Sequence, residues 1–191
     1  NTAMSPIAFR KWKPDLVHET YYSRRSVAPK GSKIVVTVHD MIHELFPEYF
    51  PKFDHTSKYK KIAVERADHV ICVSENTQKD LIQLLGISPE KTTVVHHGFA
   101  LSQTYQASLP VQNRPFILYV GSRRGYKNFD GLLSVYASES ELRDKYDLVA
   151  FGGGAFNAKE LEKIQRLYLK HSNVRQINGD DGVLATLYRR A

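Results

Sequence analysis

The sequence lacks the marks of a secreted or membrane-spanning protein. Its 191 residues include one cysteine, Cys72, so no disulfide can form within the chain. Cys72 lies in the apolar segment HVICVS, and we expect it to pack in a core rather than to act as a nucleophile. No apolar stretch approaches the roughly 20 residues of a membrane helix. No signal peptide is recognisable, although the chain begins with Asn and we expect residues to precede it. These absences favour a cytoplasmic location.

Positive charge is in excess, but no part of the chain concentrates it. The net charge is +7, and both halves of the chain, residues 1–96 and 97–191, carry similar shares of it. A nucleic-acid-binding arm would gather that charge in one segment, so we expect no nucleic-acid partner. The basic face of a helix expected over residues 57–67 could meet an anionic membrane at its inner surface. A solvated face explains these lysines more simply.

Short apolar segments alternate with helical patterns along the chain. Helices are expected over residues 57–67, 75–86 and 157–171, the second with Ser74 as its N-cap and Gly86 at its end. This alternation is typical of doubly wound parallel sheets, so we predict an α/β fold. The expected strands are short, β-branched or aromatic and bounded by turn residues; they cover residues 15–18, 33–39, 69–74, 92–97, 116–121, 147–152 and 173–178.

A polar segment that contains proline and has no periodicity interrupts this pattern. It covers residues 99–114 and is typical of a linker between domains. We therefore predict two Rossmann-like parallel-sheet units, both partial. Residues 1–98 would form the N-terminal one and residues 115–191 the C-terminal one.

The segment GSRRGYKN places cations and glycines between an expected strand and an expected helix. In parallel sheets, ligands bind beyond the carboxyl ends of the strands, and a helix N-terminus there favours anions. We therefore predict an anion site at Gly121, Arg123, Arg124 and Lys127. The alternative is a solvated basic loop.

Three consecutive glycines follow the next expected strand, in FGGGAF. Glycines at a strand end are conformationally costly, and close approach of a phosphate or a ribose would explain Gly152, Gly153 and Gly154. The dinucleotide-binding pattern G-x-G-x-x-G does not occur in the sequence, so this signal is weak when taken alone.

The first half of the chain offers polar and aromatic residues at two expected strand ends. His39 and Asp40 follow one strand and could contact a substrate. A metal site at His39, His43 and Glu44 is disfavoured, because the expected turn does not give helical ligand spacing. His18, Tyr21 and Tyr22 follow another strand and could stack on a sugar, although a half-buried aromatic pair is the simpler interpretation.

Five segments carry a resemblance to a known family. They read TVHDMIHELFP, RADHVICVSENTQKDL, VVHHGF, ILYVGSRRGYKNFDGLL and LVAFGGG. In this order they resemble the GT-B glycosyltransferases of family 4, a retaining group with many mannosyl- and glucosyltransferases. The resemblance covers nearly all of residues 14–191. It implies two Rossmann-like domains that face each other across a cleft, with the sugar nucleotide held mainly by the second.

The resemblance also implies a role for each candidate residue. Arg123 or Arg124 and Lys127, beside Gly121, would hold the donor diphosphate, and His39 would lie at the transferred sugar as the catalytic residue. Residues 152–154 would pass close to the nucleotide, with Asn178 and Asp180 of QINGDD near its base. His18, Tyr21, Tyr22 and Asp40 would lie on the acceptor side. Because no D-x-D motif occurs, we expect no metal and no other cofactor.

The expected function is transfer of a hexose from a nucleoside diphosphate sugar to a saccharide or a lipid-linked acceptor, with retention, as in polysaccharide biosynthesis. The glutamate pair of the family would lie downstream of LYRRA, where this chain ends, so we expect a fragment that could be inactive alone. Two alternatives stay open. One is a non-catalytic nucleotide- or sugar-binding module, and the other is a nucleotide-sugar epimerase of similar architecture.

Overall fold

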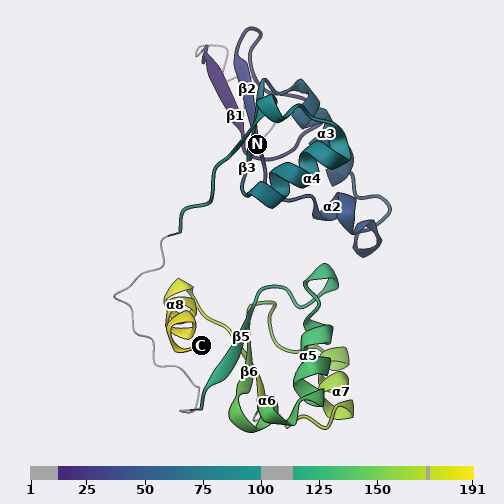
Figure 1. Cartoon of the computed structure of the whole chain (residues 1–191), viewed down its shortest axis with the longest axis vertical. Helices are drawn as coiled ribbons and strands as arrows, with labels where there is room; N and C mark the ends of the chain where they lie inside the picture. The colour runs from purple at the N-terminus through teal and green to yellow at the C-terminus, as the bar shows by residue number, and fades with distance from the viewer. Residues whose placement is uncertain (1–12, 100–113, 171–172) are drawn as a thin grey trace. The chain divides into compact units, whose positions relative to one another are not determined.

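The computed structural model describes residues 13–99, 114–170 and 173–191. The chain divides into two compact units, Asn1–Gly98 and Phe99–Ala191, which we call the N-terminal and C-terminal units (Figure 1). Most of the predicted linker lies outside the described residues. Both units are α/β with parallel sheets, so the predicted fold class is confirmed.

The N-terminal unit contains a four-stranded parallel sheet in the order β1-β2-β3-β4. Its strands are β1 (Leu16–Glu19), β2 (Lys33–Val38), β3 (His69–Cys72) and β4 (Thr92–Val94). Its helices are α2 (Ile42–Leu45), α3 (Thr56–Arg66) and α4 (Glu75–Leu85), with 3-10 turns η1 (Pro47–Tyr49) and η2 (Pro89–Lys91). Valines of β2 and β3 pack with residues of α3 and α4 in a core that includes Val36, Val38, Met41, Ala63, Val64, Val70, Cys72 and Leu81.

Helix α4 has the predicted ends. The Ser74 side chain accepts a hydrogen bond from the Thr77 amide at 3.1 Å, and Gly86 closes the helix with φ of 65°. Helix α3 differs from the expectation that its lysines lie on a solvated basic face. Lys60 has no exposed surface and is buried with Ala63 and Val64.

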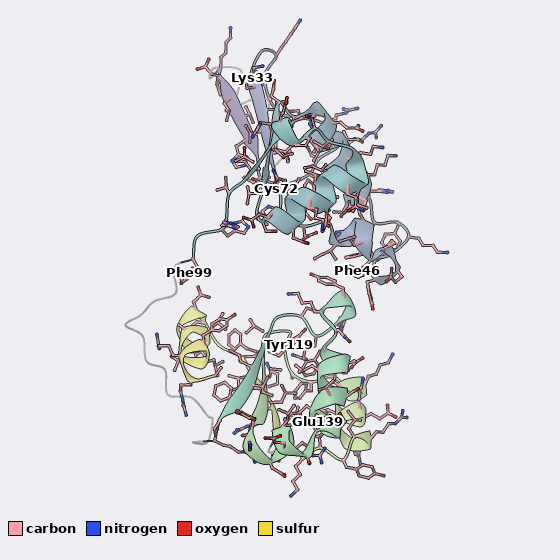
Figure 2. The ribbon with its side chains drawn as sticks, in the orientation of Figure 1. Lys33, Phe46, Cys72, Phe99, Tyr119 and Glu139 are labelled. Atoms are coloured by element: carbon pink, nitrogen blue, oxygen red, sulfur yellow. The ribbon has the colours of Figure 1, made fainter. Side chains whose placement is uncertain are left out.

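Cys72 lies in the core of the N-terminal unit, as expected (Figure 2). Burial raises the pKa of its thiol to about 11, which keeps it protonated at neutral pH. We therefore expect the native protein to be unreactive toward a thiol-specific reagent at pH 8 and to react with one equivalent after denaturation. Rapid modification of the folded protein would contradict this burial.

The C-terminal unit contains a three-stranded parallel sheet in the order β5-β6-β7. The strands are β5 (Phe116–Val120), β6 (Asp147–Phe151) and β7 (Val174–Ile177). In the described part of this unit, four helices and a 3-10 turn accompany them: η3 (Gly125–Lys127), α5 (Phe129–Ser138), α6 (Ser140–Lys145), α7 (Ala158–Arg166) and α8 (Asp181–Arg190). Figure 1 shows α5 and α7 on one face of this sheet and α8 on the other.

Helices on both faces give this unit two apolar clusters, one on each side of the sheet. The larger includes Phe129, Leu133, Tyr136, Leu148 and Ile164, and the smaller includes Phe116, Val149 and Leu187. Helix α7 is shorter than expected. It ends at Arg166. Ile164 is buried and Leu167 packs against the same apolar cluster, whereas Tyr168 is almost fully exposed with φ of 55°. A hydrogen bond from the Leu169 amide to the Ile164 carbonyl closes the turn there.

Candidate functional site

The loop after β5 carries two exposed cations beside the start of α5. Gly121 adopts φ of 120°, a conformation that favours glycine. The Lys127 ammonium lies 2.9 Å from the position that a β-carbon on Gly121 would take, so Lys127 folds back over this glycine. Asn128 then caps α5, because its side chain accepts a hydrogen bond from the Gly131 amide at 3.1 Å. Exposed Arg124 and Lys127 thus lie at the carboxyl end of β5, near a helix N-terminus.

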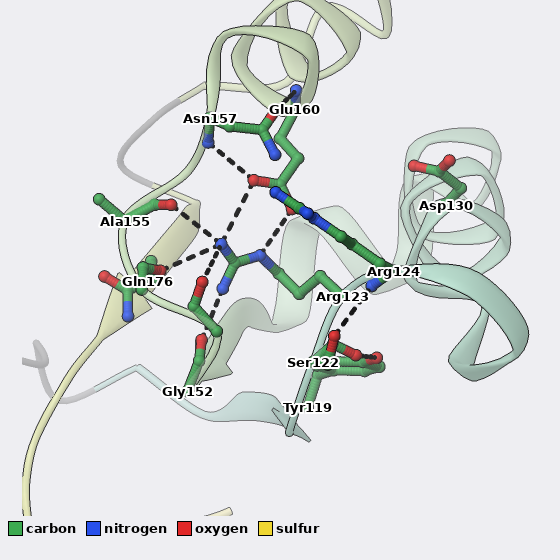
Figure 3. Close-up of polar contacts among 12 residues, drawn as sticks. Tyr119, Ser122, Arg123, Arg124, Asp130, Gly152, Ala155, Asn157, Glu160 and Gln176 are labelled. Carbon is green, nitrogen blue, oxygen red and sulfur yellow. Dashed lines mark hydrogen bonds and ion pairs between the residues drawn. The ribbon is translucent and has the colours of Figure 1, made fainter. Parts of the chain in front are cut away.

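Arg123 is buried, whereas its neighbour Arg124 is exposed. Figure 3 shows the Arg123 guanidinium between the loop after β6 and the Glu160 carboxylate. Its Nε donates to the Glu160 carboxylate at 2.8 Å, and Nη1 donates to the Gly152 carbonyl at 2.6 Å. Nη2 donates to the carbonyls of Gly154 and Ala155 at 3.0 and 3.1 Å. The guanidinium is therefore engaged at all three nitrogens inside the protein. The predicted diphosphate contact stays a prediction, and its exposed candidates are Arg124 and Lys127.

All three glycines after β6 have positive φ, of 87°, 71° and 74° at Gly152, Gly153 and Gly154. Residues with side chains rarely adopt this conformation. A β-carbon on Gly153 would also lie 2.9 Å from Nη1 of Arg123. Backbone geometry and the approach of Arg123 therefore account for these glycines without a ligand. Their predicted proximity to a nucleotide stays a prediction.

Glu160 joins the Arg123 contacts to helix α7. Its carboxylate accepts a hydrogen bond from the Asn157 amide at 2.8 Å, while the Asn157 side chain accepts one from the Glu160 amide at 3.0 Å, which forms a capping box. Burial alone would raise the pKa of Glu160, but the hydrogen bonds from Arg123 and Asn157 outweigh it and hold the pKa below its ordinary value. The carboxylate is therefore ionised opposite Arg123 at neutral pH.

The predicted base-side residues, Asn178 and Asp180, follow β7 at the same edge of the sheet. Asp180 is the N-cap of α8, because its side chain accepts a hydrogen bond from the Val183 amide at 3.0 Å. The Asn178 side chain accepts a hydrogen bond from Gln176 at 2.6 Å. Because β5, β6 and β7 are neighbours and parallel, their three following loops lie along one edge.

His39 lies among aromatic rings at the carboxyl edge of the N-terminal sheet. Its Nε2 is 3.0 Å from the Thr20 carbonyl, which can only accept, so Nε2 carries the proton. Its backbone amide donates to the Tyr22 hydroxyl at 3.2 Å, and its ring stacks on His97 with centroids 5.6 Å apart. The Tyr21 ring is tilted by 34° against the Tyr22 ring, with centroids 4.7 Å apart, and Tyr21 is exposed. The structure thus brings Tyr21, Tyr22 and His39 together, and it adds His97.

His18 and Asp40 have other local partners. The His18 ring hydrogen-bonds to the Thr37 hydroxyl at 2.7 Å, across the β1–β2 pair. The Asp40 side chain accepts from the Ile42 amide at 3.1 Å, at the start of α2. Both contacts fix local geometry, and the predicted acceptor-side roles stay predictions.

A buried lysine contacts the segment that contains His39 and Asp40. The fully buried Lys60 ammonium donates to the Asp40 carbonyl at 2.7 Å and to Glu44 at 2.6 Å, and lies 5.4 Å from the Tyr22 ring centroid. Burial also raises the pKa of the Tyr22 hydroxyl above its ordinary value, so Tyr22 stays neutral. Lys60 and Glu44 thus form an ion pair next to residues 39–40, which are predicted to contact the substrate.

The described residues include no group of three or more histidine, cysteine, aspartate or glutamate side chains placed to hold a metal ion. Within the same residues, no helix has the length and apolar character needed to cross a membrane.

A comparison of the sequence with models of known protein families identifies the family of this chain. The model of glycosyltransferase family 4 matches residues 3–103, which is just over half of the chain. The chain belongs to glycosyltransferase family 4. No curated protein matches its sequence.

Solved structures similar to this family 4 chain share its two-unit GT-B fold at low identity. A glycosyltransferase from Rickettsia africae ESF-5 is 19% identical with a TM-score of 0.63, over 100% of this chain and 53% of that one. WaaG, a glycosyltransferase involved in lipopolysaccharide biosynthesis, is also 19% identical with a TM-score of 0.63, over 99% and 55%. A putative UDP-N-acetylglucosamine 2-epimerase from Listeria monocytogenes is 15% identical with a TM-score of 0.60, over 100% and 54%. The chain spans about half the length of these structures.

Proposed function

We propose that the protein transfers a hexose from a nucleoside diphosphate sugar to a saccharide or a lipid-linked acceptor, with retention and without a metal ion. The observation that carries the proposal is the pair of exposed cations, Arg124 and Lys127, beside Gly121 at the carboxyl end of β5. When the bond between the sugar and the diphosphate breaks, negative charge grows on the leaving diphosphate. Fixed cations stabilise that charge more than they stabilise the bound donor, and so lower the barrier.

In this proposal the C-terminal unit holds the donor. Residues 152–154 would run along the nucleotide, and Asn178 and Asp180 would lie near its base. Two proteins of similar fold support a nucleotide-sugar donor. A mutant of S. aureus TarM has been solved with UDP, alpha-GlcNAc-glycerol and fondaparinux, and S. aureus MnaA has been solved with UDP.

The N-terminal unit would present the acceptor, with His39 at the transferred sugar. Tyr21 offers an exposed ring next to Tyr22, and a sugar can stack on such a ring. We place the linker at residues 99–114 and the protein in the cytoplasm, at the inner face of the membrane when the acceptor is lipid-linked.

Calorimetric titration of UDP, GDP and ADP into the intact protein tests the donor site. We expect one diphosphate to bind saturably and Lys127→Ala to weaken it about 10- to 100-fold, since one charge-assisted hydrogen bond contributes about 1.5–3 kcal/mol. Lys145→Ala is the matched control, because Lys145 is an exposed lysine of the same unit that pairs with Glu141 on α6. Absence of binding to all three diphosphates would overturn the proposed function.

The likeness to a putative UDP-N-acetylglucosamine 2-epimerase makes epimerisation the second candidate. An epimerase converts its nucleotide sugar without an acceptor, whereas a transferase releases the nucleoside diphosphate in step with glycosylated acceptor. Incubation of the donor with and without an acceptor, followed by chromatography of the sugars, separates the two. Saturable binding with neither product would instead favour a non-catalytic binding module.

A further inference from the structure

The Arg123 guanidinium donates hydrogen bonds to every carbonyl of the loop of residues 152–155. Arg123 donates to the carbonyls of Gly152, Gly153, Gly154 and Ala155, at distances from 2.6 to 3.4 Å (Figure 3). It also lies over the Phe156 ring, 4.9 Å from the centroid. Its side chain is only 2% exposed, and that of its partner Glu160 is 11% exposed. A charged pair buried to this degree is costly unless its hydrogen bonds are satisfied, and here the loop carbonyls satisfy them.

We propose that Arg123 and Glu160 are a positioning pair, which holds the loop of residues 152–155 in the form that receives the donor diphosphate. This inference rests on the proposed function. Arg123 would act through the loop and would not touch the ligand.

The orientation of the loop supplies the mechanism. Its carbonyls point at Arg123, and within the described residues the amides of Gly153, Gly154 and Ala155 have no hydrogen-bond partner. Successive backbone amides without a partner are available to donate hydrogen bonds to an anion. Without Arg123, four carbonyl dipoles would lose their common partner, and the loop would lose the contacts that hold it in this conformation.

Glu160 sets the direction of the guanidinium. It accepts from Nε and Nη2 of Arg123 at 2.8 and 3.2 Å, a two-point contact that a planar fork can make. Since Glu160 also belongs to the capping box of α7, the pair links the loops after β5 and β6 to the first turn of that helix. A lysine at position 123 would keep the charge but could not reach these acceptors from one planar group.

The substitution Glu160→Gln separates positioning from direct contact, because the two roles predict changes of opposite sign. If Arg123 contacts the diphosphate itself, Glu160 competes for it, and Glu160→Gln should tighten binding. If Arg123 positions the loop, loss of the carboxylate frees the guanidinium to turn, and binding should weaken. Glutamine also serves in a capping box, so the start of α7 is preserved.

The experiment measures nucleoside diphosphate affinity by calorimetry for the intact wild-type protein, Arg123→Lys and Glu160→Gln. Cleavage of the loop of residues 152–155 by a protease of broad specificity is followed in the absence of ligand. Arg166→Lys and Glu162→Gln are matched controls, since this Arg–Glu pair is an exposed ion pair on the same helix. We expect at least a 10-fold loss of affinity in both test variants, with faster cleavage in the loop of residues 152–155 and unchanged resistance of α5 to cleavage. The controls should bind as the wild type does.

Two outcomes would overturn the positioning role alone while leaving wild-type binding intact. The first is tighter binding by Glu160→Gln, and the second is wild-type affinity in both test variants. Failure of the wild-type protein to bind any diphosphate would overturn the proposed function, and the positioning role with it.

Discussion

Replacing Lys60 by methionine is expected to lower the free energy of unfolding of the N-terminal unit by about 3–5 kcal/mol. The Lys60 side chain is fully buried, and its ammonium is the partner of Glu44, whose own side chain is 10% exposed. Atom Oε1 of Glu44 is buried and has no hydrogen-bond partner within the described residues. Removal of the ammonium would therefore leave a buried carboxylate with no compensating charge.

Denaturant unfolding followed by circular dichroism measures this loss. Lys61→Met is the matched control, because Lys61 is an exposed neighbour on α3 whose pair with Glu65 is 3.9 Å long, and such pairs contribute little. The double variant Lys60→Met with Glu44→Leu should recover most of the loss, since it removes both charges together. Equal stability of Lys60→Met and Lys61→Met would show that the buried pair contributes nothing.

The helix face that contains Lys60 was only partly predictable from the sequence. Lys60, Ala63, Val64 and Ala67 follow the spacing i, i+3, i+4 and i+7, which marks one helix face, and all four are buried. The face was therefore predictable from its apolar members. Lys60 belongs to this face because its ammonium contacts Glu44, 16 residues earlier in the chain, and the Asp40 carbonyl. Only the fold brings these groups together, so the sequence does not show it.

The strands of the described residues were predictable because each is a local apolar segment between turn residues, and the structure shortens most of them by one to three residues. The caps at Ser74 and Gly86 were predictable for the same reason, since they depend on neighbours within one turn. The end of α7 was not, because the positive φ of Tyr168 contradicts the usual preference of a tyrosine.

The difference between Arg123 and Arg124 was beyond the sequence. Both follow the same strand, and either could have been the exposed cation. The choice depends on Glu160 and on the carbonyls of residues 152–155, which lie about 30 residues further along the chain and reach Arg123 only through the pairing of β5 with β6. Long-range contacts of this kind decide which side chain of a loop turns inward.

The same contacts predict unequal effects of alanine at two neighbouring glycines. Gly153 and Gly154 have nearly the same φ, 71° and 74°, so alanine at either should cost about 1–2 kcal/mol for the left-handed backbone. A β-carbon at position 154 would meet nothing within 4 Å. At position 153 it would lie 2.9 Å from Nη1 of Arg123 and 3.4 Å from the Gly121 carbonyl oxygen, an overlap that should add about 1–3 kcal/mol.

Thermal and denaturant unfolding of Gly153→Ala and Gly154→Ala, without ligand, measures the difference between these two costs. Both alanines incur the same cost for the left-handed backbone. The difference between their free energies of unfolding therefore measures how firmly Arg123 is held against the loop. An Arg123 that moves aside freely would make the two variants equally stable, and that result would contradict the tight packing of the guanidinium. If Gly153→Ala is clearly the less stable variant, glycine is required at position 153 because Arg123 packs against it, whether or not a ligand binds. The run of three glycines in the sequence does not reveal this requirement.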